Sequence, residues 1–275
     1  MTDHRTFLYD NATTGRRGFL GAVAMASALT LLNRVRLADA AVAPRARNVV
    51  LVHGLYADGS SWANVIGPLL DAGLRVTSVQ NPLTTLAESV AATRRALAMQ
   101  QGPTVLAGHS WSGTIVSEVG DDPKVSALVY IAALQPDKGE ASGQVMSKFA
   151  APNDAMRVST NRATPDHKYF YIPPAKFRET YAADVPAPDA QFMADSEQQL
   201  AQKAMGAPLS VAAWRNKPSY AILTTQDRVI APELQRWMYQ RSGSKVTEVS
   251  ASHAVFVSQP AAVAQVIEAA AKQEI

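Results

Sequence analysis

The chain of 275 residues contains, in the order serine, aspartate, histidine, three side chains whose types could cooperate in nucleophilic catalysis. A serine hydroxyl is a weak nucleophile at neutral pH unless a neighbouring histidine takes its proton and an acidic side chain orients that histidine. Ser110 lies in the segment GHSWSG (108–113), and Asp227 and His253 follow later in the chain. We therefore predict a catalytic triad in which Ser110 attacks a carbonyl carbon, His253 is the base and Asp227 is the acid.

The sequence around Ser110 favours a nucleophile elbow, which is a sharp turn from a strand into a helix. Residues 104–108 form an apolar run typical of a buried strand, and residues 112–119 have a helical pattern. The residues two before and two after the nucleophile must be small in such a turn, and Gly108 and Ser112 meet this requirement. The usual motif has glycine where Ser112 stands. The alternative interpretation is that Ser110 is an ordinary helix N-cap.

Asp227 and His253 each follow an expected strand, at 219–224 and 245–249 respectively. Open α/β sheets bind their ligands at the carboxyl ends of the strands, so this position favours a role in one shared site. Without that role, Asp227 would be a turn residue and His253 a surface loop histidine. Asp137 is the alternative acid, because it also follows an expected strand.

Few other histidines compete for the role of base, because only four follow position 41: His53, His109, His167 and His253. We expect His53 to shape a loop by hydrogen bonding, His109 to point away from the nucleophile and His167 to lie in an inserted segment. No two of them have the spacing of metal ligands, and the chain has no cysteine. We therefore expect neither a metal site nor a cofactor.

Acyl transfer also requires two positioned hydrogen-bond donors for the negative charge that develops on the carbonyl oxygen. The backbone N–H of Trp111, directly after the predicted nucleophile, is expected to be one of them. The loop after the first expected strand, 49–53, is expected to supply the other through the N–H of Leu55. Gly54 would permit the turn that this loop needs.

Short apolar runs alternate with helical patterns after residue 44, which is typical of a mostly parallel sheet with helices on both faces. The expected strands are 49–53, 75–79, 104–108, 125–132, 219–224 and 245–249. The expected helices are 60–72, 86–100, 112–119, 232–242 and 260–272. This alternation is interrupted over 136–215, which we expect to be an inserted, mostly helical lid between the core segments 41–135 and 216–275.

Residues 1–40 are typical of an export signal. The segment TGRRGFL (14–20) leads into an uncharged stretch, 19–32, that is too short to cross a bilayer comfortably. Paired arginines in this context resemble a twin-arginine signal, and Ala-Asp-Ala at 38–40 would place the cleavage before Ala41. The alternative is an amphipathic first helix. We expect a periplasmic or secreted mature protein that uses the twin-arginine export machinery.

The net charge of +3 gives little reason to expect a nucleic-acid partner. Residues 1–40 hold five arginines and three aspartates, so their removal leaves a net charge of +1. A hydrophobic content of 47% and a charged content of 18% exclude a disordered chain. We therefore expect a small-molecule partner and no membrane association after cleavage. Nothing in the sequence specifies an oligomeric state.

Four stretches of this chain resemble the α/β-hydrolase superfamily, and within it bacterial relatives of the plant methylesterases and hydroxynitrile lyases. The stretches are VVLVHG (49–54), GHS (108–110), DRVIAP (227–232) continuing to QRW (235–237), and SHAVFVSQP (252–260). The resemblance implies an α/β-hydrolase fold with a triad of Ser110, His253 and Asp227 and an oxyanion hole formed by Leu55 and Trp111. It also implies esters of small alcohols or of aromatic acids as substrates.

The sequence differs from this family at two places, and both differences limit which activities and substrates we expect. The lyases have a lysine directly after the catalytic histidine, whereas this chain has Ala254, which argues against cyanohydrin cleavage. The methylesterase loop after His-Gly is replaced by LYADG (55–59), so methylesterase preferences do not carry over.

Our hypothesis is a serine esterase that cleaves carboxylic esters of small or apolar substrates through an acyl-enzyme. The alternatives are a cofactor-independent oxygenase or perhydrolase on the same fold, and a non-catalytic receptor for small ligands. Ten apolar or aromatic side chains could line the pocket: Trp111, Leu134, Met146, Phe149, Tyr169, Phe170, Tyr171, Phe192, Met193 and Trp214.

Overall fold

The structure is a computed structural model that describes residues 46–149, 162–163, 165–166 and 168–273. The export signal expected at 1–40 and the lid histidine His167 lie outside these residues, and both expectations stay predictions. In the described ranges, no helix combines the length and the apolar character needed to span a membrane. The same ranges contain no group of three or more histidine, cysteine, aspartate or glutamate residues that could hold a metal ion.

The core is a six-stranded sheet in which every pair of neighbouring strands runs parallel. Its strand order is β2-β1-β3-β4-β8-β9. The strands are β1 (Asn48–Val52), β2 (Arg75–Val79), β3 (Thr104–His109), β4 (Val125–Ile131), β8 (Ser219–Thr224) and β9 (Lys245–Val249). The register pairs Val52 of β1 with Gly108 of β3, so the loop after β1 begins beside the turn after β3. The expected α/β architecture with a mostly parallel sheet is confirmed.

The position of each strand in the sheet follows from its side chains. All five residues of β1, NVVLV, are buried, as required of a central parallel strand that is covered on both faces. Burying one such valine or leucine side chain stabilises the fold by roughly 1.5–3 kcal/mol. The outermost strands instead carry charged side chains, RVTSV in β2 and KVTEV in β9. Exposed charges of this kind discourage pairing with another chain at the sheet edge.

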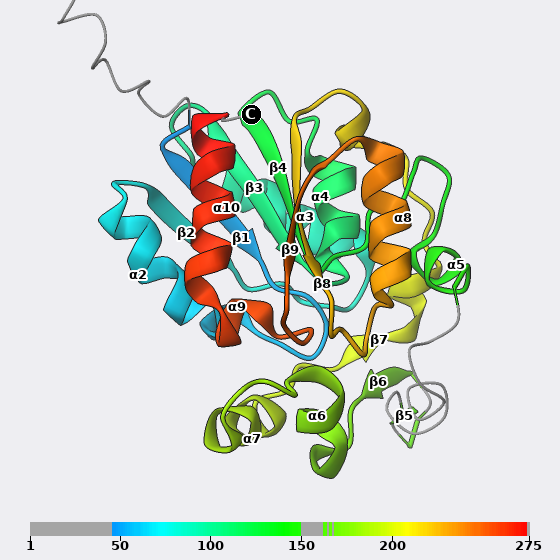
Figure 1. Cartoon of the computed structure of the whole chain (residues 1–275). Coiled ribbons are helices and arrows are strands. Elements are labelled where there is room, and N and C mark those ends of the chain that lie inside the picture. Colours follow the sequence, from blue (N-terminus) through cyan, green and yellow to red (C-terminus); the bar gives the residue numbers. More distant parts are fainter. Residues whose placement is uncertain (1–45, 150–161, 164, 167, 274–275) are drawn as a thin grey trace, which may run out of the picture. The chain divides into compact units, whose positions relative to one another are not determined.

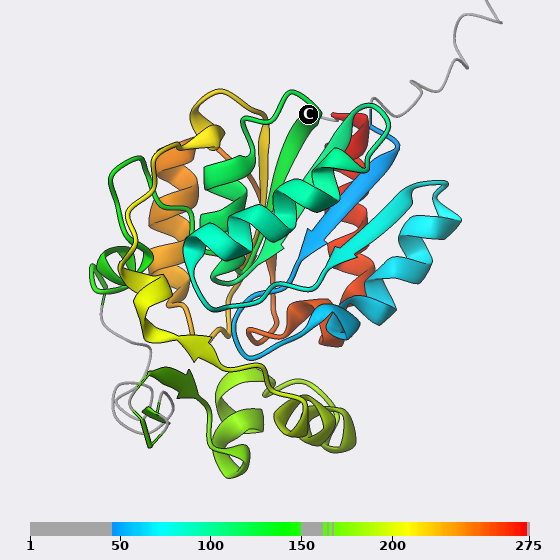
Figure 2. The same ribbon diagram turned by 180° about the vertical axis from the view of Figure 1, so that it is seen from behind.

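Helices cover both faces of the sheet, with α2 and α10 on one face and α3 and α4 on the other (Figures 1 and 2). A further helix, α8, packs against β8. The bounds are α2 (Ala63–Asp71), α3 (Leu86–Ala98), α4 (Ser112–Val119), α8 (Pro232–Ser242) and α10 (Pro260–Lys272). Proline at the first position of α8 and α10 suits a helix start, where no N–H partner is needed.

Two local elements differ from the expectation. The helix expected at 60–72 is divided into a 3₁₀ turn, η1 (Gly59–Trp62), followed by α2, because Asp58 caps the 3₁₀ turn through the N–H of Ser60. A short helix, α9 (Val255–Ser258), begins two residues after His253 and was not expected. Its four residues are too few to show a helical period in the sequence.

The segment 136–215 contains more strand than the sequence indicated. Its helices are α5 (Ser142–Met146), α6 (Pro174–Tyr181) and α7 (Ala187–Asp195), with 3₁₀ turns η3 (Gln202–Gly206) and η4 (Ala213–Arg215). It also holds a three-stranded antiparallel sheet of β5 (Arg162–Ala163), β6 (Tyr169–Tyr171) and β7 (Leu200–Ala201). Strands of two or three residues carry no alternating pattern long enough to detect. Figure 1 shows α6 and α7 beyond the carboxyl ends of the core strands.

Candidate active site

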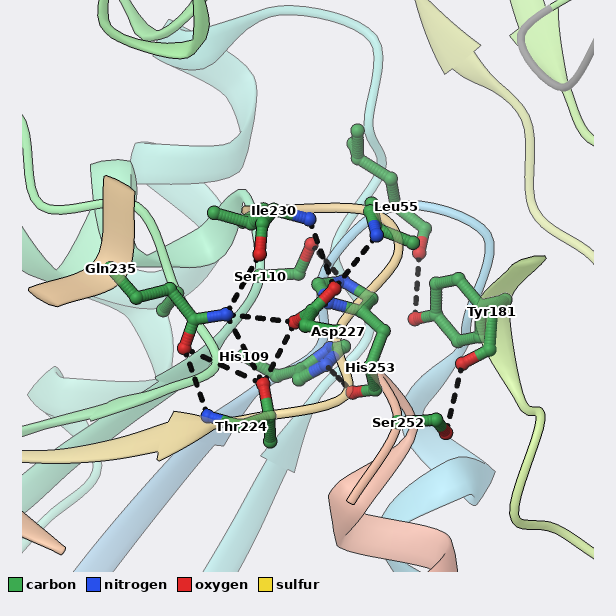
Figure 3. A network of polar contacts seen from close by, with 12 residues as sticks. Leu55, His109, Ser110, Tyr181, Thr224, Asp227, Ile230, Gln235, Ser252 and His253 are labelled. Atoms are coloured by element: carbon green, nitrogen blue, oxygen red, sulfur yellow. Dashed lines mark hydrogen bonds and ion pairs between the residues drawn. The ribbon is translucent and has the colours of Figure 1, made fainter. Parts of the chain in front are cut away.

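The three residues of the predicted triad form one chain of hydrogen bonds (Figure 3). His253 Nε2 lies 2.7 Å from Ser110 Oγ, and His253 Nδ1 lies 2.7 Å from Asp227 Oδ2. All three are buried, with at most 2% of each residue exposed. Because a carboxylate only accepts hydrogen bonds, the imidazole proton is on Nδ1, and Nε2 accepts from the Ser110 hydroxyl.

The carboxylate of Asp227 accepts four further hydrogen bonds. Its Oδ1 accepts from the backbone N–H groups of Val229 at 2.7 Å and Ile230 at 2.9 Å. Its Oδ2 accepts from the Thr224 hydroxyl at 2.8 Å and from Gln235 Nε2 at 2.9 Å. These contacts fix the carboxylate opposite the imidazole. The roles of Thr224 and Gln235 in holding this carboxylate were not predicted from the sequence.

The alternative acid, Asp137, has a different partner. Arg215 Nε donates to Asp137 Oδ1 at 2.8 Å, in an ion pair at the base of the inserted segment. This hydrogen bond to Arg215 lowers the pKa of Asp137 below its usual value. The carboxylate that reaches His253 is therefore Asp227, not Asp137.

Ser110 occupies a left-handed backbone conformation, with φ of +57°, directly after β3. Such a conformation is uncommon for a residue with a β carbon and costs of order 1–3 kcal/mol. The turn is held because the Ser110 N–H donates to the Ile131 carbonyl at 3.1 Å and its own carbonyl accepts from the N–H of Gly113 at 3.1 Å. A β carbon on Gly108 would lie 2.6 Å from Val116 Cγ2, which is why only glycine fits there. This is the geometry of a nucleophile elbow.

The loop after β1 approaches this elbow closely. A β carbon on Gly54 would lie 2.6 Å from both the His109 carbonyl oxygen and Ser110 Cβ, so glycine is required for the approach. Leu55, which follows Gly54, lines the same pocket as Ser110 and Trp111. The two residues expected to supply the backbone donors thus line the same pocket as the predicted nucleophile.

A buried polar cluster supports the peptide that carries the Leu55 N–H. As expected, His53 shapes this loop: its Nδ1–H donates to the Gly54 carbonyl at 3.0 Å, and this carbonyl belongs to the same peptide group as the Leu55 N–H. The Asn81 N–H donates to His53 Nε2 at 2.9 Å. Burial lowers the pKa of His53, so the ring is neutral, with one donor and one acceptor. The Ser112 hydroxyl donates to the His53 carbonyl, which links the start of α4 to the end of β1.

His109 contacts the predicted base, a contact that the sequence did not indicate. Its ring centroid lies 4.6 Å from that of His253, and its Nε2–H donates to the His253 carbonyl at 2.9 Å. Burial lowers the pKa of His109 well below its usual value, so the ring is neutral. A neutral ring beside His253 adds no positive charge that would oppose protonation of the base.

An apolar pocket opens beside Ser110. Its volume is about 450 Å³, including the space at its mouth that is open to solvent. None of the described residues that line it is charged. They are Leu55, Tyr56, Ser110, Trp111, Leu134, Met146, Phe170, Leu200, Met205, Val229 and Ile230.

Only some of the ten side chains that could line the pocket do so. Trp111, Leu134, Met146 and Phe170 line it, whereas Phe192 is 65% exposed. Trp214 instead donates through Nε1 to a backbone carbonyl of Pro136 and packs against arginine side chains. The pocket is also lined by residues that were not expected to line it, which are Tyr56, Leu200, Met205, Val229 and Ile230.

Glu197 is a half-buried acid of the inserted segment that lies near the pocket residue Tyr56. Its carboxyl group accepts from the backbone N–H of Ile172 at 2.7 Å. Burial raises the pKa of Glu197 from 4.5 to about 8, and the hydrogen bond from Ile172 offsets only part of this increase. Folding therefore takes up a proton at this residue between pH 4.5 and about pH 8.

This protonation predicts a stability difference between the native chain and Glu197→Gln that depends on pH. The native protein should lose stability as pH rises from about 4.5 to about 8, whereas the neutral glutamine should remove that loss. Because Glu197 is only partly buried, we expect a difference of about 2 kcal/mol at about pH 9 and almost none at about pH 5. Thermal melting at both pH values measures it. Glu179→Gln, which alters an exposed ion pair with Lys176, is the control. An equal difference at both pH values would contradict the prediction.

Comparison with known proteins identifies the family. A model of the alpha/beta hydrolase family matches residues 49–266, which include the elbow, Asp227 and His253. The chain belongs to this family. The alpha/beta hydrolase is 26% identical to esterase PIR7B of Oryza sativa subsp. japonica over 245 residues, which cover 78% of this chain and 91% of the rice protein.

Solved structures of other hydrolases share the fold of this alpha/beta hydrolase. A pyrethroid hydrolase from Sphingobium faniae JZ-2 has a TM-score of 0.71 at 21% identity, covering 83% of this chain and 98% of its own. The methylesterase MES16 from Arabidopsis has a TM-score of 0.64 at 18% identity, covering 79% and 95% respectively. The expected resemblance to plant methylesterases is thus confirmed.

Proposed function

We propose that this alpha/beta hydrolase cleaves uncharged carboxylic esters through an acyl-enzyme formed on Ser110. The hydrogen-bonded chain from Asp227 through His253 to Ser110 is the observation that supports the proposal most strongly, with both distances at 2.7 Å. It joins a nucleophile, a base and an acid in the order that serine hydrolysis requires. The rice relative bears the name esterase, which agrees with this chemistry.

In the first step, His253 Nε2 takes the proton of the Ser110 hydroxyl while Oγ forms a bond to the carbonyl carbon. The carbonyl oxygen becomes an oxyanion, which accepts hydrogen bonds from the N–H groups of Leu55 and Trp111. His253 then gives its proton to the oxygen of the departing alcohol as the bond to the carbonyl carbon breaks. An acyl ester of Ser110 remains.

In the second step, His253 Nε2 takes a proton from water while the water oxygen attacks the acyl carbon. The same two N–H groups hold the new oxyanion, and the proton returns to Ser110 Oγ as the carboxylic acid leaves. Asp227 accepts from Nδ1–H throughout, so it holds the imidazole in one tautomer and stabilises its protonated form.

The pocket lining favours an uncharged acyl group. A carboxylate in this pocket would lose its hydration without meeting a cationic side chain among the described lining residues. Ala254, at the position of the lyases' lysine, is fully buried and supplies no positive charge. The proposed substrates are therefore esters whose acyl group is uncharged and apolar.

A matched pair of substrates tests this proposal. We expect p-nitrophenyl butanoate to be hydrolysed with kcat/KM on the order of 100-fold above that of the p-nitrophenyl hemiester of butanedioic acid. The two acyl chains have the same length, but the second ends in a carboxylate whose desolvation costs several kcal/mol. Release of p-nitrophenol measures both rates. Equal rates for the two substrates would show that the pocket does not select by charge, and no turnover of any short ester would refute the proposed function.

A further inference from the structure

Tyr181, the last residue of α6 in the inserted segment, contacts two loops of the site, the one that carries Leu55 and the one that carries His253. Its hydroxyl donates to the Leu55 carbonyl at 3.0 Å (Figure 3). Its own backbone carbonyl accepts from the N–H of Ala254 at 3.0 Å, directly after His253. Tyr181 is fully buried, so neither contact exchanges freely with water. One residue outside the core thus joins the loop after β1 to the loop after β9.

The ring of Tyr181 also packs against the predicted base. Its centroid lies 4.9 Å from that of His253 at an interplanar angle of 77°, in an edge-to-face arrangement. Burial raises the pKa of Tyr181 well above its usual value, so its hydroxyl stays protonated and keeps donating to Leu55.

The contact with Leu55 fixes one peptide group of the loop. The Leu55 carbonyl accepts from Tyr181, and the N–H of the same peptide group, that of Tyr56, donates to the Gln198 carbonyl at 3.2 Å. Tyr56 has a φ of +63°, a left-handed conformation that is unfavourable for a side chain of this size and needs outside support. Both ends of this peptide group are therefore held by the inserted segment.

The preceding peptide group carries the Leu55 N–H, and His53 holds its carbonyl from the side of the core. The direction of that N–H depends on the backbone dihedral angles of Leu55, which join the two peptide groups. If the peptide group between Leu55 and Tyr56 turned, the dihedral angles of Leu55 would change, and the Leu55 N–H would no longer be directed at the oxyanion. Oxyanion donors must be positioned within a few tenths of an ångström to act, so this support has a kinetic consequence.

We propose that Tyr181 is a positioning residue for ester hydrolysis, whose hydroxyl holds the peptide group between Leu55 and Tyr56 so that the N–H of Leu55 is directed at the oxyanion. The inference rests on the function proposed above. Through Tyr181, the inserted segment would position a catalytic group in addition to lining the pocket. Tyr181 acts through Leu55 and does not touch the substrate.

Tyr181→Phe tests the proposal because it deletes the hydroxyl and keeps the ring against His253. We expect kcat for p-nitrophenyl butanoate to fall about tenfold while KM stays within about twofold, since a misdirected donor costs less than a deleted one, which costs about 100- to 1,000-fold. The rate of phosphonylation of Ser110 by a fluorophosphonate should fall by the same factor, because its phosphoryl oxygen occupies the oxyanion position. Titration with the same reagent counts competent sites, so kcat is expressed per folded molecule.

Tyr130→Phe is the matched control. Tyr130 is also fully buried, and its hydroxyl pairs with Ser117 at 3.1 Å inside the core. This variant should lose stability without a change in kcat per titrated site. The proposal is overturned if Tyr181→Phe keeps kcat within twofold of wild type, if only KM rises, or if Tyr130→Phe lowers kcat equally. Ester turnover that survives Ser110→Ala refutes the proposed function instead, and an inert wild type refutes both.

Discussion

Replacement of Ser110 by alanine is expected to lower kcat for p-nitrophenyl butanoate by about 100,000-fold or more. The imidazole of His253 would then have no hydroxyl to activate, and the two backbone donors alone supply only a small residual rate. Alanine adds no atom at a position where the chain already holds a β carbon at φ of +57°, so the fold should persist. Initial rates and circular dichroism measure these two expectations.

Covalent labelling gives the same prediction a second readout. A fluorophosphonate should modify the wild-type chain on the peptide that contains Ser110, and Ser110→Ala should stay unlabelled. Ser117→Ala is the control, because Ser117 is a fully buried serine of α4, the helix that follows Ser110, and it pairs with Tyr130. Its turnover should remain near that of wild type. A label on another peptide, or turnover unaffected by Ser110→Ala, would exclude the acyl-enzyme mechanism.

Replacement of Asp227 by asparagine is expected to lower kcat by about 10,000-fold. Three donors besides the imidazole, from Val229, Ile230 and Gln235, are N–H groups directed at this carboxylate. An amide cannot accept from all of them, since its NH₂ group would face a donor in either orientation. We therefore expect that the His253 imidazole is no longer held in the tautomer with its proton on Nδ1. We also expect the free energy of unfolding to fall.

Asp137→Asn is the matched control for this variant. Asp137 was the alternative acid in the sequence, and its carboxylate pairs with Arg215. Its replacement should change kcat by less than about twofold, because Asp137 pairs with Arg215 and the His253 imidazole pairs with Asp227. Steady-state kinetics of both variants decide between the two acids. A larger loss of kcat in Asp137→Asn than in Asp227→Asn would show that the acid of the triad is Asp137 and not Asp227.

The sequence was sufficient to predict the strands and helices of the core, because each of them shows a pattern of apolar residues within its own segment. Parallel strands such as β1 are short, mostly apolar runs between turns, and the helical patterns between them are long enough to recognise. Strand ends then predict the site, since the residues after β3, β8 and β9 meet at one edge of the sheet. Ser110, Asp227 and His253 could be named together for this reason.

Sequence patterns failed where an element is short or a contact is distant. The two- and three-residue strands β5, β6 and β7 have no period to detect, so a segment with a small sheet was expected to be mostly helical. The pocket lining was only partly predicted because aromatic side chains such as Trp214 pack elsewhere equally well.

The sequence by itself determined the strand and helix order, the elbow at Ser110 and the chain positions of the histidine and the acid. Only the tertiary structure decided which distant groups support them: Gln235 behind Asp227, His109 against His253, and Tyr181 on the Leu55 carbonyl. The physical reason is that local patterns report which face of an element is buried. The partner of a buried polar group depends on packing between distant segments, such as those of His109 and His253, which are 144 residues apart.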